Sequence, residues 1–112
     1  ADEFLVADLR RWDACLKATE GMDHVYALAA DMGGMGYISH NHAKILANNA
    51  LINIHTLDAA RRSGVKRYLY TSSACIYPEY KQLDAHVAPL KEGDAYPAMP
   101  QDADGWEKLV AE

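Results

Sequence analysis

Short apolar runs alternate with segments of helical periodicity along this chain. Residues 3–9 (EFLVADL) predict a strand that ends at Asp8. Residues 24–30 (HVYALAA) are almost continuously apolar, which is typical of a strand buried on both faces. Residues 65–73 (VKRYLYTSS) predict the next strand.

Two helices are predicted between these strands. Residues 13–20 (DACLKATE) predict a short helix with Asp13 as its N-cap and Gly21 as the C′ residue. Helically spaced apolar positions then predict a long helix from about Ser39 to Ser63, which Gly64 ends.

All four prolines lie between Pro78 and Pro100, so this segment is predicted to be an extended loop. Residues 102–112 (DADGWEKLVAE) predict a final helix. Asp104 is its expected N-cap, and Glu107, three residues later, completes a capping-box pattern.

This order of elements is that of an α/β fold with a parallel sheet and right-handed crossovers. Ligands of such sheets bind at the carboxyl ends of the strands. Here those ends carry Asp8, residues 29–36 (AADMGGMG) and residues 71–75 (TSSAC). We therefore expect the functional residues to lie along one edge of the sheet.

Composition limits the classes of function. The 112 residues carry a net charge of −5 and are 50% hydrophobic, which fits one soluble globular domain. An acidic chain without a basic stripe argues against binding nucleic acid or an anionic membrane surface. No apolar run reaches the ~18 residues of a membrane span, and no signal-peptide pattern opens the sequence. We expect a cytoplasmic protein.

The cysteines and histidines give no metal-ligand pattern. Cys15 and Cys75 lie sixty residues apart, so the sequence leaves a disulfide between them as an alternative, but we expect both thiols to be reduced. His40 and His42 are two residues apart, on different faces of a helix, and we expect no metal site there.

Four stretches of the chain resemble the extended short-chain dehydrogenase/reductase family of sugar-nucleotide enzymes, and within it the enzymes that epimerise GDP-mannose. The stretches are FLVADLR, LAADMGGMGYISHNHAKILANNALIN, RYLYTSSACIYPEYKQL and LKEGDAYPAMPQDADGWEKL. The resemblance covers nearly the whole chain. Family members begin with a strand and a glycine-rich turn and end with a substrate-binding region. We therefore expect residues 1–112 to be the central part of an NAD-binding, partial Rossmann-like domain with flanking helices, from which both of those parts are absent.

The resemblance implies an NAD-dependent epimerisation. Oxidation of the sugar at C4 to a ketone acidifies the protons on C3 and C5, which an acid/base pair then exchanges. Cys75 matches one member of this pair, and a thiol with a free pKa near ~8.5 suits proton exchange in both directions. Its lysine partner would lie beyond residue 112. The alternative for Cys75 is a small buried hydrophobic residue at a strand end.

Other substrate-binding residues follow from the same resemblance. Ser73 matches a hydroxyl that hydrogen-bonds the reacting sugar oxygen, and the small Ala74 lets the substrate approach. Met32 and Gly33 match the loop over the hexose. Without the resemblance, a serine at a strand end and a glycine pair indicate only turns.

The resemblance implies that NAD is the cofactor and that five residues bind it. Asp8 matches an acid that accepts a hydrogen bond from the adenine amine. Leu28, Ala29 and Ala30 match the stretch beside the nicotinamide ribose and pyrophosphate, and Lys108 matches the lysine that binds the ribose. A loop aspartate and a plain buried strand are the alternatives for Asp8 and for residues 28–30.

Asp104 departs from the family pattern, which has Tyr-x-x-x-Lys where this chain has DGWEK. Spacing of four places Asp104 and Lys108 on one helical face. Aspartate is shorter than tyrosine and, with a pKa near ~4, is a weak base for an alcohol. We expect pairing with Lys108 to lower its pKa further, so helix capping is the better account of Asp104.

Two interpretations follow. The first is a catalytic segment of a nucleotide-sugar epimerase, which the resemblance implies to be a cytoplasmic homodimer at full length and to serve ascorbate biosynthesis. The second is a non-catalytic Rossmann-like fragment or pseudoenzyme that binds a nucleotide sugar or a protein partner. A 4-epimerase or dehydratase is a related alternative, but these enzymes lack a cysteine in the context of Cys75.

Overall fold

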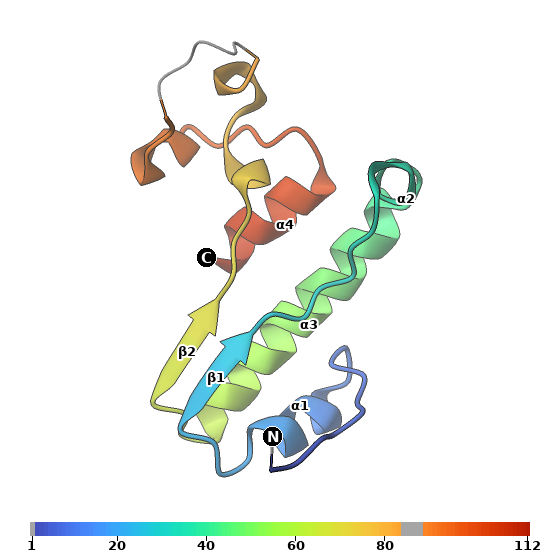
Figure 1. The fold of residues 1–112 in the computed structure, drawn as a ribbon, viewed down its shortest axis with the longest axis vertical. Helices are drawn as coiled ribbons and strands as arrows, with labels where there is room; N and C mark the ends of the chain where they lie inside the picture. The colour runs from blue at the N-terminus through green and yellow to red at the C-terminus, as the bar shows by residue number, and fades with distance from the viewer. Residues whose placement is uncertain (1, 84–88) are drawn as a thin grey trace. The chain divides into compact units, whose positions relative to one another are not determined.

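The computed structural model describes residues 2–83 and 89–112 and divides the chain into two compact units (Figure 1). The first unit comprises Ala1–Met32 and Ala47–Thr71. The second unit comprises Gly33–Leu46 and Ser72–Glu112. Each unit brings together segments that are distant in the sequence.

A parallel pair of strands forms the sheet of the first unit. Strand β1 (His24–Ala27) pairs with β2 (Arg67–Tyr70), with His24 opposite Arg67 and Ala27 opposite Tyr70. The connection between the two strands contains helix α3 (His42–Arg62). Parallel strands need such a long crossover, so the predicted α/β class is confirmed.

Helix ends in the first unit follow the predicted glycine signals. Helix α1 (Trp12–Thr19) is followed by Gly21 with φ of +73°, and α3 is followed by Gly64 with φ of +74°. Glycine adopts this left-handed conformation at no steric cost. The N-cap prediction for α1 is wrong: Asp13 lies in the first turn, where its carboxylate pairs with Arg11 at 3.0 Å.

Side-chain hydrogen bonds join helix α3 to β2, and the residue that follows α3 to α1. The Thr56 and Tyr68 hydroxyls lie 2.9 Å apart, and those of Thr19 and Ser63 lie 3.0 Å apart. These bonds satisfy polar groups at the junctions between elements. Among the described residues, no helix combines the length and apolarity required to cross a membrane.

Two strand predictions are corrected. Residues 3–9 form no strand, and Phe4 and Val6 are 87% and 85% exposed, because no described segment supplies the neighbouring backbone that a strand requires. Strand β1 is shorter than predicted and is not buried on both faces, since Tyr26 is 66% exposed. A two-stranded sheet leaves one of its faces uncovered among the described residues.

The long helix predicted from about Ser39 to Ser63 is α3, which begins three residues later, at His42. Residues 39–40 instead end a short helix that the sequence did not predict, α2 (Met35–His40), and Asn41 separates the two helices. The loop from Pro78 to Pro100 contains the short 3₁₀ helices η2 (Glu79–Lys81) and η3 (Glu92–Ala95). Lys81 Nζ and Asp94 Oδ1 join them at 2.9 Å. Residues 84–88 of this loop lie outside the described residues.

The N-cap of helix α4 (Ala103–Ala111) lies two residues earlier than predicted. Asp102 is the N-cap, and its Oδ1 accepts a hydrogen bond from the Gly105 amide at 3.1 Å. Asp104 and Glu107, the residues predicted to form the capping box, are 3% and 4% exposed instead. The capping prediction for Asp104 is therefore wrong.

Candidate functional site

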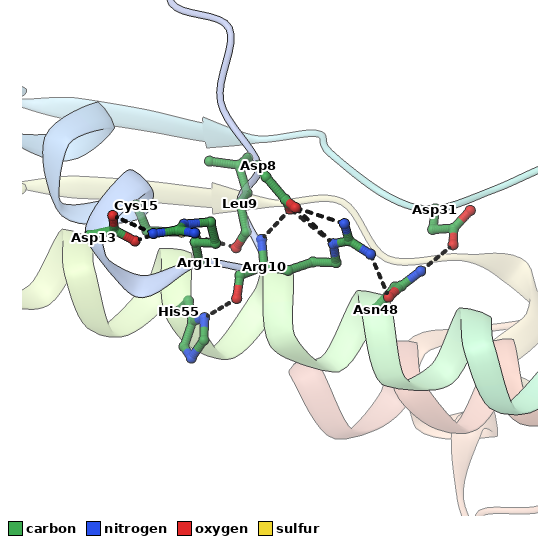
Figure 2. Close-up of polar contacts among 9 residues, drawn as sticks. All are labelled: Asp8, Leu9, Arg10, Arg11, Asp13, Cys15, Asp31, Asn48 and His55. Carbon is green, nitrogen blue, oxygen red and sulfur yellow. Dashed lines mark hydrogen bonds and ion pairs between the residues drawn. The ribbon is translucent and has the colours of Figure 1, made fainter.

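The carboxylate of Asp8 is held by Arg10 in the first unit (Figure 2). Oδ1 accepts from the Arg10 amide at 3.0 Å and from Nε at 2.9 Å, and Oδ2 accepts from Nη2 at 2.7 Å. The side-chain hydrogen bonds from Arg10, followed by the backbone one, lower the pKa of Asp8 to about 2. Asp8 is therefore an ionised hydrogen-bond acceptor at neutral pH.

A chain of side chains leads from Asp8 to the loop after β1. Arg10 Nη1 donates to Asn48 Oδ1 at 3.2 Å, and Asn48 Nδ2 donates to Asp31 Oδ2 at 2.7 Å. The sequence prediction missed Arg10 and Asn48. The Asp-x-Arg spacing could have suggested Arg10, whereas nothing local in the sequence relates Asn48 to Asp31.

The loop after β1 is fixed by a buried asparagine. Asn49 is 1% exposed; its Oδ1 accepts from the Asp31 amide at 2.6 Å and its Nδ2 donates to the Asp31 carbonyl at 3.2 Å. The preceding residues 28–30 are exposed. They lie in the same unit as Asp8, so the structure places four predicted cofactor-binding residues in one unit: Asp8, Leu28, Ala29 and Ala30.

An apolar pocket of about 200 Å³ lies beside this loop and is lined by Leu9, Cys15, Ala18, Thr19, Val25, Tyr26, Ala27, Leu28, Ala29, Ile52, Asn53 and Thr56. Its polar side chains already have partners, as Thr56 with Tyr68 and Asn53 with Tyr70 show. The pocket therefore offers few groups to orient a polar ligand.

A short 3₁₀ helix, η1 (Ala74–Ile76), presents Cys75 in the second unit. Ser73 is its N-cap, and the Ser73 Oγ accepts from the Cys75 amide at 3.2 Å, an arrangement that leaves the hydroxyl proton to be donated. Ile76 is buried and anchors the turn, while Ala74 and Cys75 are exposed. Cys75 is therefore not the buried hydrophobic residue of the alternative interpretation.

Cys15 differs from Cys75 in its surroundings. It is 0% exposed, its Sγ lies 3.1 Å from the Leu9 carbonyl oxygen, and burial raises its pKa, with the charges of Asp13 and Asp8 adding to the effect. Both cysteines are free thiols in the described part of the chain.

Helix α4 packs closely against η1 at Gly105. A Cβ atom on Gly105 would collide with the Cys75 carbonyl oxygen and would lie 2.8 Å from the Pro100 Cβ. Only glycine permits this approach. The contact brings the helix that carries Asp104 and Lys108 against the turn that carries Ser73 and Cys75.

Asp104 and Lys108 are both buried, at 3% and 7% exposure. Oδ1 of Asp104 has no hydrogen-bond partner within residues 2–83 and 89–112. Burial raises the pKa of Asp104, the charge of Asp102 raises it further, and Lys108 acts in the opposite direction with the smallest effect. The prediction that the pKa of Asp104 would fall is therefore wrong: the charge of Lys108 does lower it, but desolvation outweighs this attraction.

Gly33 lies in the second unit, and Met32 is the last residue of the first stretch of the first unit. A Cβ atom on Gly33 would lie 2.8 Å from the Tyr37 Cδ1, so glycine here allows the Tyr37 ring to fold back on the chain. Lys44 Nζ lies 5.6 Å from the centre of that ring. This packing gives Gly33 a local role beside the predicted sugar contact.

Comparison with known proteins identifies a family and close relatives. The model of the NAD dependent epimerase/dehydratase family matches residues 1–103. GDP-mannose 3,5-epimerase of Arabidopsis thaliana is 59% identical over 111 residues, which are 99% of this chain and 29% of that protein. GDP-mannose 3,5-epimerase 1 of Oryza sativa subsp. japonica is 61% identical over 110 residues, 98% of this chain and 29% of that protein. The chain thus spans 29% of the length of these relatives.

Solved structures share the fold. A short-chain dehydrogenase/reductase superfamily protein from Agrobacterium tumefaciens with bound NAD superposes with a TM-score of 0.75 at 28% identity, over 95% of this chain and 30% of its own. A GDP-L-fucose synthetase from Naegleria fowleri bound to NADP superposes with a TM-score of 0.75 at 25% identity, over 94% of this chain and 34% of its own. These similarities confirm the predicted Rossmann-like α/β class.

Proposed function

The chain belongs to the NAD dependent epimerase/dehydratase family, and from this premise we propose that it forms part of an enzyme that converts GDP-mannose to GDP-galactose by inverting C3 and C5 of the sugar. One observation carries the proposal. In a chain 59% identical to a GDP-mannose 3,5-epimerase, the exposed thiol of Cys75 lies on a turn held against the helix that bears Lys108.

The residues of the first unit fit the adenine side of NAD. The ionised Asp8 supplies an acceptor for the adenine amine, and the exposed residues 28–30 let a dinucleotide approach the backbone beyond β1. Lys108 would donate to the nicotinamide ribose. Bound NAD would supply reversible hydride transfer at C4 of the sugar.

Cys75 would exchange the proton at one of the two inverted carbons. Ser73 would donate its hydroxyl proton to a sugar oxygen while its Oγ accepts from the Cys75 amide, which occupies one of its two lone pairs. Ala74 would leave room for the sugar, and Met32 and Gly33 would cover the hexose. The whole enzyme would be a cytoplasmic homodimer in ascorbate biosynthesis, a proposal that the family resemblance alone supports.

Asp104 favours a second candidate function, a protein that binds NAD and a nucleotide sugar with little turnover. A carboxylate at this position lacks the reach of the family tyrosine and, although burial raises its pKa, remains a weaker base than a phenolate. Removal of the C4 hydroxyl proton would then be slow.

A chimaera tests both candidates. Residues 1–112 replace the matching segment of the Arabidopsis thaliana relative, and deuterium incorporation at C3 and C5 of GDP-mannose is measured in D₂O by mass spectrometry. We expect exchange that is slower by ~10²–10⁴-fold than in an Asp104→Tyr variant, the usual scale for a general base. Equal exchange with Asp104 and tyrosine would contradict the assigned role of position 104.

A Cys75→Ser variant in the Asp104→Tyr background separates the role of Cys75 in proton exchange from the binding of NAD. We expect exchange at one carbon to be lost while NAD binding is retained, with Cys15→Ser as the matched control that keeps exchange at both carbons. Full exchange at C3 and C5 in Cys75→Ser would refute the acid/base role of Cys75, and no exchange at either carbon in the Asp104→Tyr parent would refute the epimerase proposal.

A further inference from the structure

The lone pairs of Asp8 are almost all occupied. Its carboxylate has about four acceptor positions. Oδ1 accepts from the Arg10 amide and Nε, and Oδ2 accepts from Nη2, with Nε also 3.2 Å away. Nε has a single proton, so its bond to Oδ2 is the longer branch of a hydrogen bond shared with Oδ1, and Nη2 is the one donor among the described residues that Oδ2 does not share. A ligand donor can therefore take the remaining acceptor position on Oδ2. Both side chains are about half exposed, at 43% and 47%, so a ligand can reach it.

Arg10 is itself held from helix α3 at two separate points. Its Nη1 donates to Asn48 Oδ1, and its backbone carbonyl accepts from His55 Nδ1 at 2.9 Å. Asn48 and His55 are seven residues apart, so they lie on one face of α3. A half-exposed arginine is therefore fixed at its backbone and at its guanidinium, although exposed arginines usually sample many rotamers.

The amide of Asn48 has one orientation that satisfies both neighbours. Its oxygen faces the Arg10 guanidinium and its nitrogen faces the Asp31 carboxylate at 2.7 Å. The flipped amide would place NH₂ against a cation and oxygen against an anion. Asn48 thus connects the turn that carries Asp8 to the first residue after the stretch 28–30.

We propose that Arg10 and Asn48 are positioning residues that aim the remaining Oδ2 acceptor of Asp8 at the exocyclic amine of the adenine ring and tie this end of the site to the loop after β1. The inference rests on the proposed function, which assigns NAD to this site.

Selectivity for an amino-purine is the chemical consequence. Adenine presents a donor at its exocyclic position, whereas hypoxanthine presents a carbonyl oxygen that a carboxylate repels. A hydrogen bond to a charged acceptor is worth roughly 10-fold or more in affinity. The selectivity requires a carboxylate fixed in direction, because a rotating one could turn away from the hypoxanthine oxygen.

The test compares binding of NAD with binding of nicotinamide hypoxanthine dinucleotide by calorimetry, on the chimaera described above. We expect the unmodified segment to prefer NAD by roughly 10-fold, and Arg10→Met to reduce this ratio to about 2-fold or less, mainly through weaker NAD binding. Arg61→Met is the matched control, because Arg61 forms an exposed ion pair with Asp58 at 2.7 Å and should leave the ratio unchanged. Exposed ion pairs add little stability, so all variants should melt within about 2 °C of the parent.

A residue swap tests the link through Asn48. Asn48→Asp keeps an acceptor for Arg10 but sets a carboxylate against Asp31, and should lower the ratio. Adding Asp31→Asn restores a donor at position 31 and should recover the ratio, which a purely structural role for either residue does not predict.

The outcomes distinguish this inference from the proposed function. If the unmodified segment does not discriminate between the two dinucleotides, adenine is not read by Asp8, and both the cofactor placement and the inference are wrong. If it discriminates and Arg10→Met retains the full ratio, the cofactor placement stands and the positioning role of Arg10 is refuted. Failure of the swap to recover the ratio refutes the role of Asn48.

Discussion

The two cysteines have opposite environments, which determine their reactivity. Thiolates are the reactive species, so an exposed thiol reacts faster than one whose pKa is raised by burial. Cys75 is exposed on η1, and Cys15 is 0% exposed with a raised pKa.

We therefore expect brief alkylation with iodoacetamide to label Cys75 at least 10-fold faster than Cys15 in the folded full-length chimaera. Peptide mass spectrometry measures the two rates, and a denatured sample in which both react alike is the control. Faster labelling of Cys15 would contradict the environment described for η1.

Asp104 should make stability depend on pH. Its folded pKa is raised mainly by burial, so the cost of ionising it is absent below its unfolded pKa near ~4 and appears as the pH rises through the folded value. Asp104→Asn removes this cost and should stabilise the chimaera at pH 7 by on the order of 1 kcal/mol, with a smaller effect at pH 3.5.

Urea unfolding midpoints of the Asp104 and Asn variants at the two pH values provide the measurement. The pH 3.5 comparison is the internal control, since both side chains are then uncharged. A stability difference that is the same at both pH values would show that the carboxyl does not titrate in a buried setting.

At the scale of elements, the close packing of α4 on η1 depends on one missing side chain. Gly105→Ala would normally gain helix propensity, by about 0.5–1 kcal/mol. Here the added Cβ collides with the Cys75 carbonyl oxygen and contacts Pro100, so we expect a net loss of about 1–3 kcal/mol together with slower proton exchange.

Gly36→Ala in α2 is the matched control, because a Cβ there meets nothing within 4 Å. It should be neutral or slightly stabilising in the same urea experiment. If Gly105→Ala behaves like Gly36→Ala, α4 does not approach η1 as closely as the structure shows.

At the scale of the whole molecule, the first unit holds the residues proposed to contact the adenine end and the ribose side of NAD, and its described residues include no glycine-rich phosphate-binding turn before a helix. That turn and helix N-terminus normally bind the pyrophosphate. We therefore expect residues 1–112 alone to bind NAD at least 100-fold more weakly than the chimaera, as measured by calorimetry. Submicromolar binding to the isolated chain would contradict this expectation.

Sequence alone determined the features that depend on local chemistry. The glycines at 21 and 64 end their helices because only glycine adopts the left-handed backbone cheaply, and the alternation of strand and helix patterns determined the parallel α/β class. The motif around Cys75 located the candidate thiol.

Tertiary structure decided the features that depend on neighbours. The predicted strand at residues 3–9 lacks a pairing backbone, and the cap of α4 is Asp102 because Asp104 is buried against the rest of its unit. The pKa of Asp104 rises although Lys108 is nearby, since burial is a property of packing. Asn48 hydrogen-bonds Arg10, which is 38 residues away in the sequence, and Asp31, which is 17 residues away. A contact between such distant residues leaves no periodic signal in the sequence.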